Sequence, residues 1–172
     1  DFRIAQLKKL RAAIYEFVRQ EVKIDDTFLI LSPLYHTGVM MHWLAFLIAG
    51  ARGVIMPDIS PRNIFEAVHR EKVTVAFLLV PWVLDILGAL ERGELKMSDY
   101  DFSRWRLMYT GAQPCPVSLV HQWRRYFPDM PCHNTYGLSE ATGPGCVYLP
   151  ADAQHKAGAI GKPGFNWDAR IV

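Results

Sequence analysis

The segment Val73-Thr-Val-Ala-Phe-Leu-Leu-Val80, followed by Pro81, decides the predicted fold. The run is almost entirely apolar and rich in β-branched side chains, and its apolar and polar positions do not alternate. Such a run is typical of a strand that is buried on both faces of a sheet. Pro81 favours the first turn of a helix, and the sequence predicts this helix through about Leu90.

The same order of apolar strand and helix recurs on both sides of this segment. Further strands are predicted at 27–31, 53–56, 106–110, 133–136 and 168–172. Further helices are predicted at 4–18, 39–49, 60–70 and 116–127. Strand runs that are bounded by helices are typical of a parallel sheet covered on both faces. We therefore predict an α/β fold, with a mostly parallel sheet and helices on both faces, in which residues 1–172 form a single unit.

Charge, hydropathy and cysteine content argue against several classes of protein. The net charge is only +2 and the basic residues are scattered, so no nucleic acid partner is expected. The apolar stretch 39–51 is too short to span a membrane and contains His42, and the stretch 73–90 is interrupted by Pro81 and Asp85. Three cysteines without close spacing, and no leader sequence, predict a cytoplasmic protein.

Three loops that follow predicted strands contain unusual residues. They span residues 33–38, 110–116 and 136–143. In an open α/β sheet, ligands bind beyond the carboxyl ends of the strands. If the strands are parallel, these loops lie along one edge of the sheet and form a cleft.

The strongest chemical signal is Asn134-Thr-Tyr-Gly-Leu-Ser-Glu-Ala-Thr-Gly143. Tyr136 offers an aromatic face for a base, and Gly137 allows a ligand to approach the backbone. Ser139 offers a hydroxyl for a phosphate, and Glu140 offers a carboxylate for a cation. The residues alone leave a second interpretation open, in which a buried tyrosine is followed by a turn that caps a helix.

Tyr136-Gly-Leu-Ser-Glu140 resembles the Tyr-Gly-x-Thr-Glu signature of the adenylate-forming superfamily, which includes acyl- and aryl-CoA synthetases, luciferases and the adenylation domains of peptide synthetases. Ser32-Pro-Leu-Tyr-His-Thr-Gly38 is similar to the Pro-Leu-Phe-His segment that opens the family's acid pocket. Tyr109-Thr-Gly-Ala-Gln-Pro114 resembles the Ser-Gly-Gly-Ala-Pro turn between the adenine and acyl sites. Gly158-Ala-Ile-Gly-Lys-Pro-Gly164 is similar to the Gly-x-x-Gly-x-Pro segment. The four segments follow the family's order along the chain.

The resemblance implies roles for individual residues. Ser139 would hydrogen-bond the α-phosphate, where the family more often has Thr, and Glu140 would bind Mg²⁺; both are expected to be catalytic. The implied nucleotide-binding set is Gly111, Ala112, Gln113, Pro114, Asn134, Thr135, Tyr136, Gly137 and Ser139, with Tyr136 packed against adenine. The implied acid pocket is formed by Tyr35, His36, Gly111 and Leu138. For His36, a role in capping the next helix remains an alternative.

The resemblance also implies an activity, that of an ATP-dependent acid–thiol ligase. Such an enzyme joins a small carboxylic acid to AMP and then to CoA, and it uses ATP, Mg²⁺ and CoA. Amino-acid-activating relatives place an Asp in the segment that matches 34–41, which has no acidic residue here. A buried ammonium without a partner is costly, so a plain organic acid is expected, in fatty acid metabolism or a related setting. The identity of the acid and the oligomeric state are left open.

Several parts of the family's apparatus are not found in these residues. The family has a Ser/Thr/Gly-rich phosphate loop before the helix that matches 4–18, and a C-terminal lid domain with the lysine of the adenylation step. The chain is therefore expected to be an internal fragment of the large N-terminal domain and inactive by itself. Two alternatives stay open: a non-catalytic nucleotide-binding or scaffold remnant of the same fold, and an α/β nucleotide-binding or transferase module of other descent.

Overall fold

The computed structural model describes residues 3–5, 7–8, 22–31, 33–141, 143–148, 156–164 and 167–170. Residues 3–5 and 7–8 are helical, and the rest of the predicted helix 4–18 lies outside the described residues. The strand predicted at 168–172 is wrong for residues 168–170, which belong to no strand.

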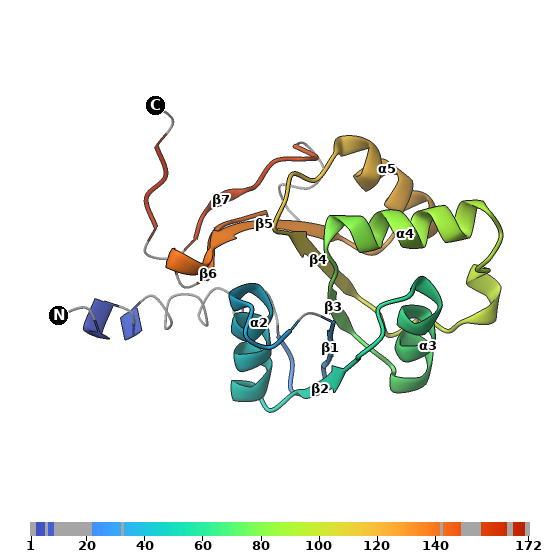
Figure 1. The fold of residues 1–172 in the computed structure, drawn as a ribbon, viewed down its shortest axis with the longest axis horizontal. Helices are drawn as coiled ribbons and strands as arrows, with labels where there is room; N and C mark the ends of the chain where they lie inside the picture. The colour runs from blue at the N-terminus through green and yellow to red at the C-terminus, as the bar shows by residue number, and fades with distance from the viewer. Residues whose placement is uncertain are drawn as a thin grey trace.

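The described part of the chain forms a seven-stranded sheet with the order β2-β1-β3-β4-β5-β6-β7 (Figure 1). Its strands are β1 (Thr27–Ile30), β2 (Arg52–Ile55), β3 (Val75–Phe77), β4 (Leu107–Gly111), β5 (Cys132–Leu138), β6 (Gly143–Val147) and β7 (Lys162–Pro163). Strands β1 to β5 pair in parallel, whereas β6 pairs antiparallel with both β5 and β7. The prediction of a mostly parallel sheet is confirmed, and the two antiparallel strands were not predicted.

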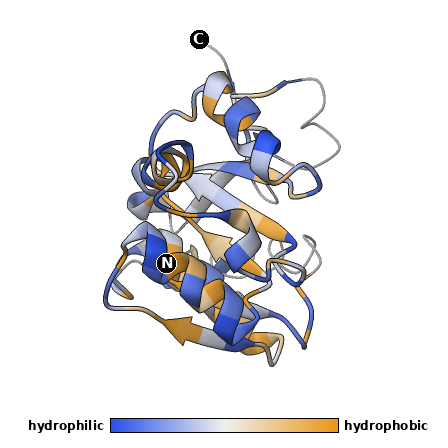
Figure 2. Ribbon diagram, turned by 90° about the vertical axis from the view of Figure 1, so that its right-hand side faces the viewer, coloured by the Kyte–Doolittle hydropathy of each residue, from blue (hydrophilic) through white to orange (hydrophobic). Residues whose placement is uncertain are grey.

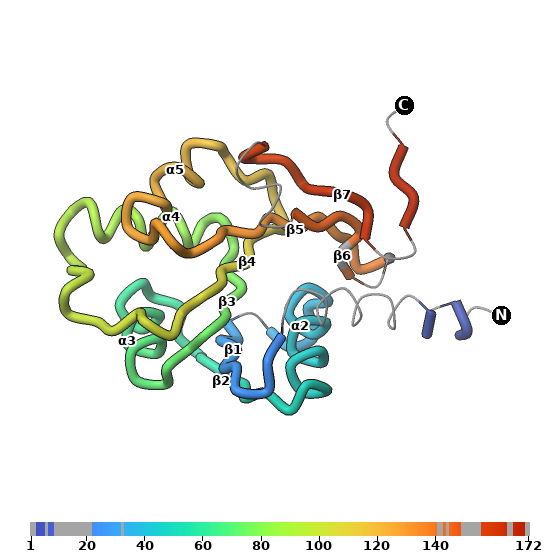
Figure 3. The backbone as a smooth tube through the Cα atoms, turned by 180° about the vertical axis from the view of Figure 1, so that it is seen from behind, coloured from blue at the N-terminus to red at the C-terminus, as the bar shows by residue number. Residues whose placement is uncertain are grey.

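Helices cover both faces of the sheet, as predicted. They are α2 (Thr37–Ile48), α3 (Pro61–Glu71), α4 (Val80–Glu91) and α5 (Val117–Tyr126), with short 3-10 helices η1 (Met97–Asp99) and η2 (Ser139–Ala141). In Figures 1 and 3, α3, α4 and α5 lie together on one side of the strands and α2 lies on the other. None of the described helices is long and apolar enough to cross a membrane.

The two larger hydrophobic cores of the described residues form because neighbouring strand residues point to opposite faces of the sheet. In β1, Leu29 packs into the core under α3, α4 and α5, whereas Phe28 packs into the core under α2. β3 divides in the same way, with Ala76 in the first core and Val75 in the second. The strands at the centre of Figure 2 therefore carry hydrophobic segments, while the surrounding helices alternate between hydrophobic and hydrophilic residues.

Local sequence signals explain where the helices begin. Ser60 caps α3, because its hydroxyl accepts a hydrogen bond from the Asn63 backbone N–H at 3.3 Å. The segment 73–80 is shorter as a strand than predicted, since only Val75–Phe77 pairs with its neighbours. Helix α4 starts at Val80, one residue before the predicted start at Pro81.

A buried ionic network fixes the amino-terminal ends of the central strands. The Asp26 side chain is buried and accepts hydrogen bonds from Arg106 Nη2 at 2.5 Å and from the Thr74 hydroxyl at 2.7 Å. The Lys23 backbone N–H also donates to this carboxylate, at 2.7 Å. Burial raises the pKa of Asp26, but the hydrogen bonds from Arg106, Lys23 and Thr74 outweigh burial and leave the pKa below its ordinary value.

We expect Asp26→Asn to lower the free energy of unfolding by about 2 kcal/mol, because charge-assisted hydrogen bonds in a buried network are lost. Urea denaturation of the wild type and of Asp26→Asn measures the difference between their free energies of unfolding. Asp25→Asn is the matched control, since the Asp25–Arg104 ion pair is exposed and its loss costs less than about 0.5 kcal/mol. Equal effects of the two substitutions would show that the Asp26 network does not stabilise the fold.

Candidate active site

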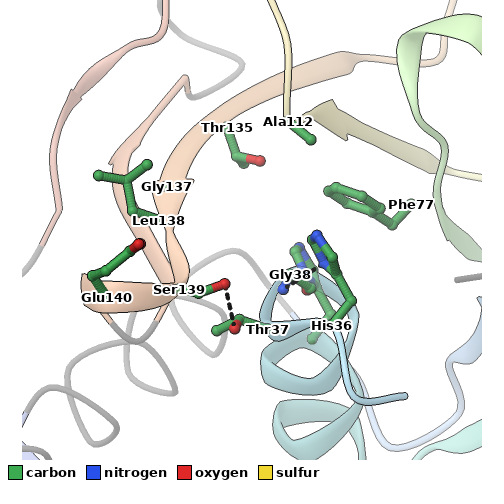
Figure 4. A pocket seen from close by; sticks show the side chains of 12 residues that line it. His36, Thr37, Gly38, Phe77, Ala112, Thr135, Gly137, Leu138, Ser139 and Glu140 are labelled. Carbon is green, nitrogen blue, oxygen red and sulfur yellow. Dashed lines mark hydrogen bonds between the residues drawn. The ribbon is translucent and has the colours of Figure 1, made fainter. Parts of the chain in front are cut away.

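A cavity of about 280 Å³ lies where the strands β3, β4 and β5 end (Figure 4). It is lined by His36, Thr37, Gly38, His42, Phe77, Ala112, Thr135, Gly137, Leu138, Ser139, Glu140 and Gly143. All three loops that the sequence singled out contribute to this lining. Their convergence follows from the parallel order of β1, β3, β4 and β5, whose carboxyl ends meet at one edge of the sheet.

The wall formed by α2 carries His36, which both caps the helix and lines the cavity. Its Nδ1 accepts a hydrogen bond from the Gly38 backbone N–H at 3.2 Å. In the neutral ring, a histidine whose Nδ1 accepts carries its proton on Nε2. The two roles weighed for His36 are therefore compatible, and Nε2 is left as a hydrogen-bond donor.

The opposite wall is formed by the ends of β4 and β5. The Thr135 hydroxyl donates to the Thr110 carbonyl at 3.2 Å. A Cβ on Gly111 would lie 2.4 Å from the Thr135 carbonyl oxygen, so the two strands approach this closely only because residue 111 is glycine. The next residue, Ala112, has φ 67°, a left-handed conformation that is costly for a residue with a side chain. Such strain is concentrated at functional sites.

One hydrogen bond joins the two walls. The Thr37 hydroxyl, at the first position of α2, donates to Ser139 Oγ at 3.0 Å, and both residues line the cavity (Figure 4). Ser139 begins η2 and Glu140 follows it, and both side chains line the cavity. The structure therefore places the predicted hydroxyl and carboxylate beside the predicted acid-pocket residue His36.

The inner part of the lining contains His42 and Phe77, which the sequence analysis did not propose as site residues. His42 is buried, its Nδ1 hydrogen-bonds the Gly38 carbonyl, and its ring lies 5.1 Å from the Phe77 ring and 4.9 Å from the Tyr109 ring. Burial lowers the pKa of His42 to about 4, against the opposing effect of the hydrogen bond to Gly38. The ring is therefore neutral at pH 7. Phe77 ends β3, and its position at a strand end was a signal that could have identified it.

Six of the predicted site residues do not line the cavity. They are Tyr35, Gly111, Gln113, Pro114, Asn134 and Tyr136. Tyr35 is 86% exposed. Thr135 lines the cavity, and the side chain of the next strand residue, Tyr136, is therefore directed to the other face of β5. Asn134 shares that other face, where its side-chain amide donates to the Ala159 carbonyl at 3.1 Å.

The strand end thus separates two regions. The cavity on the α2 side contains His36 and Leu138 of the predicted acid pocket together with Ser139, whereas the partly exposed Tyr136 lies on the other face of β5, the face on which Asn134 contacts Ala159. That segment stays close to the sheet because Gly161 has φ 88° and a Cβ there would lie 2.0 Å from the Val147 carbonyl oxygen. The roles assigned to the individual residues stay predictions.

The donor set around Glu140 fits a particular kind of metal binding. Within the described residues, no group of three or more His, Cys, Asp or Glu side chains is arranged to hold a metal ion. Mg²⁺ commonly binds through one or two carboxylates together with substrate phosphates and water. A lone carboxylate beside the Ser139 hydroxyl, the predicted phosphate ligand, meets this requirement, so Glu140 would hold Mg²⁺ only together with a bound nucleotide.

Known proteins similar to this chain include several CoA ligases. Indoleacetate–CoA ligase from Aromatoleum aromaticum is 31% identical over 153 residues, which are 88% of this chain and 29% of that protein. 4-Coumarate–CoA ligase from Pinus taeda is 35% identical over 153 residues, which are 86% of this chain and 27% of that protein. The chain therefore spans less than a third of the length of either relative.

Solved structures confirm the fold. A long-chain-fatty-acid–CoA ligase from Archaeoglobus fulgidus matches with a TM-score of 0.79 at 19% identity, over 91% of this chain and 32% of that one. The o-succinylbenzoate–CoA synthetase from Bacillus subtilis, in complex with ATP and a magnesium ion, matches with a TM-score of 0.76 at 21% identity, over 91% of this chain and 31% of that one.

A model of one protein family covers nearly all of the sequence. It describes an AMP-binding enzyme and matches residues 4–172. The chain belongs to the family of AMP-binding, adenylate-forming enzymes.

Proposed function

We propose that these residues are part of an ATP-dependent acid–thiol ligase, which converts a carboxylic acid into an acyl-adenylate and then into a CoA thioester. The observation that carries the proposal is the cavity that brings Ser139 and Glu140 together with His36 and Phe77. The names of the similar CoA ligases support CoA as the acceptor. The activity is that of the whole protein, of which this chain contributes the acid pocket and part of the nucleotide site.

The cavity residues suit the chemistry of adenylate formation. A carboxylate is a poor acylating agent until its oxygen is attached to AMP, and negative charge develops on the phosphoryl oxygens during the transfer. Ser139 would donate a hydrogen bond to the α-phosphate, and Glu140 would hold Mg²⁺ beside it. Positioning and charge stabilisation of this kind account for most of the catalysis in phosphoryl transfer.

The proposed nucleotide lies across the end of β5, with its base on the far side. Tyr136 is 46% exposed, and its ring offers a face on which adenine can stack. Stacking of this kind contributes about 1–3 kcal/mol. The phosphate would then reach Ser139 past Gly137, where no side chain obstructs it.

The lining favours an acid without an ammonium group. The segment 34–41 contains no acidic residue, His42 is neutral at pH 7 and Phe77 adds an aromatic wall. An ammonium there would have only Glu140, the proposed Mg²⁺ ligand, as an acidic partner in the lining, and an ammonium left unpaired would be costly.

Release of pyrophosphate by the full-length protein, over a panel of aryl and acyl acids, tests the proposal. We expect release that depends on the acid, and a thioester when CoA is added. The 172-residue chain alone should give neither, because it spans less than a third of the relatives' length. Pyrophosphate release that does not depend on any acid would contradict the proposed reaction, and turnover by the isolated chain would contradict the need for the remaining protein.

A further inference from the structure

The hydrogen bond between Thr37 and Ser139 joins positions 102 residues apart in the sequence. Figure 4 shows it running from the first turn of α2 to the start of η2, between two residues that line the cavity. The signature that marks the site includes Ser139 but not Thr37. Nothing in the proposed reaction has so far required a hydroxyl at position 37.

The Thr37 hydroxyl is not needed to start its own helix. The capping position of α2 is His36, whose ring nitrogen accepts the hydrogen bond from the Gly38 backbone N–H. The oxygen of Thr37 instead serves Ser139, at a distance of 3.0 Å. A helix-capping role therefore does not explain this hydroxyl.

Ser139 lies in an exposed part of the chain. Residues 136–140 are all exposed, and η2 is a single 3-10 turn. Exposed segments with few packed side chains open at low free energy. Helix α2, by contrast, is well packed: Val39 and Phe46 are buried against strands of the sheet, and Met41 is buried in a smaller cluster with Ala45. A bond from α2 therefore ties Ser139 to the better-packed wall of the cavity.

The direction of the hydrogen bond has a chemical consequence. A hydroxyl has one donor and two acceptor positions, so once Ser139 gives its proton to a phosphate oxygen, Thr37 must be the donor in the 3.0 Å hydrogen bond between the two hydroxyls. Hydrogen bonds in a chain polarise one another, and a hydroxyl that accepts one becomes a better donor. A phosphate oxygen can only accept hydrogen bonds. Ser139 is thus prepared to donate to it.

We propose that Thr37 is a positioning residue, which orients the Ser139 hydroxyl as a hydrogen-bond donor to the phosphate during adenylate formation. The inference rests on the proposed function, because it assigns a partner to the residue expected to contact the α-phosphate. By this inference a hydroxyl of helix α2, which also carries the predicted acid-pocket residue His36 at its capping position, helps to bind the nucleotide through Ser139.

The test compares Thr37→Val with Thr37→Ser in the full-length protein. Valine keeps the branched shape and removes the hydroxyl, whereas serine keeps the hydroxyl. We expect Thr37→Val to lower kcat for acid-dependent pyrophosphate release by roughly 5- to 10-fold, the effect of one lost hydrogen bond. The KM for the acid should stay within about twofold, and Thr37→Ser should restore kcat to within about twofold of the wild type.

A double-mutant cycle separates orientation of Ser139 from a general structural effect. In a Ser139→Ala background, Thr37→Val should cause no further loss, because the hydroxyl that it orients is already gone. Full wild-type activity of Thr37→Val, or a second multiplicative loss in the double mutant, would overturn the inference. Should Thr37→Val fail to fold, Thr37→Ala removes the same hydroxyl and enters the same cycle.

The cycle also distinguishes this inference from the proposed function. If Ser139→Ala alone keeps wild-type activity, the phosphate-binding role of Ser139 is wrong and the proposed function loses its support there. If Ser139→Ala is impaired while Thr37→Val is not, only the role of Thr37 is wrong.

Discussion

Glu140→Gln in the full-length protein is expected to slow adenylate formation by about 100-fold, the effect typical of losing one group that stabilises transition-state charge. Glutamine has nearly the same size and keeps one oxygen, but it lacks the negative charge that a metal ion requires. Among the described residues that line the cavity, Glu140 is the sole carboxylate. No neighbouring acid in that lining can therefore replace it.

A magnesium titration of pyrophosphate release measures this effect. The variant should need more Mg²⁺ for half-maximal activity, and excess Mg²⁺ should restore only part of the rate. Glu91→Gln is a suitable control, since Glu91 is exposed on α4 and away from the cavity. An unchanged magnesium titration in Glu140→Gln would remove Glu140 from the proposed metal site.

The second large effect is a loss of stability in mild acid. His42 and His133 are both buried, and burial lowers the pKa of each to about 4. In the unfolded chain, each of the two imidazole rings binds a proton with a pKa near 6.5. Their contribution to stability is therefore fully present above about pH 6.5 and is lost as the pH falls toward 4. Each histidine should account for about 3 kcal/mol over this window.

Urea denaturation at several pH values between 7.5 and 4.5 tests this expectation. The free energy of unfolding should fall steadily below pH 6.5, and His133→Leu should flatten the curve. His121→Gln is the control, because His121 is exposed on α5 and should leave the pH dependence unchanged. A wild-type stability that stays constant between pH 7.5 and 4.5 would show that the two buried histidines are not held neutral.

The parallel half of the fold was predictable because its strands are apolar runs that end at helix signals. Ser60 before Pro61 and Pro81 after the run 73–80 gave helix starts to within one residue. The antiparallel strand β6 was not predictable in this way, since Gly143-Pro-Gly-Cys-Val147 contains residues that ordinarily interrupt strands. Its pairing with β5 depends on tertiary contacts and a register shift after Tyr136.

The candidate site was predictable where a motif marks it and not where only packing does. Ser139 and Glu140 stand in the signature and line the cavity. His42 lies in the apolar run of α2, and nothing in that run indicates that its ring would reach the cavity. Thr37 bonds to a residue 102 positions away, a contact that only the folded chain brings about. Side chains of a strand alternate between its two faces. The face on which the Tyr136 ring lies could therefore be stated only after the structure had shown that Thr135 lines the cavity.

The central claim is that one nucleotide crosses the end of β5, with its base at Tyr136 and its phosphate at Ser139. A crystal structure of the full-length protein with AMP and Mg²⁺ tests it most directly. We expect adenine against the Tyr136 ring and a phosphate oxygen within hydrogen-bonding distance of Ser139 Oγ. Ordered AMP bound elsewhere, with Tyr136 and Ser139 both out of contact with it, would contradict the claim.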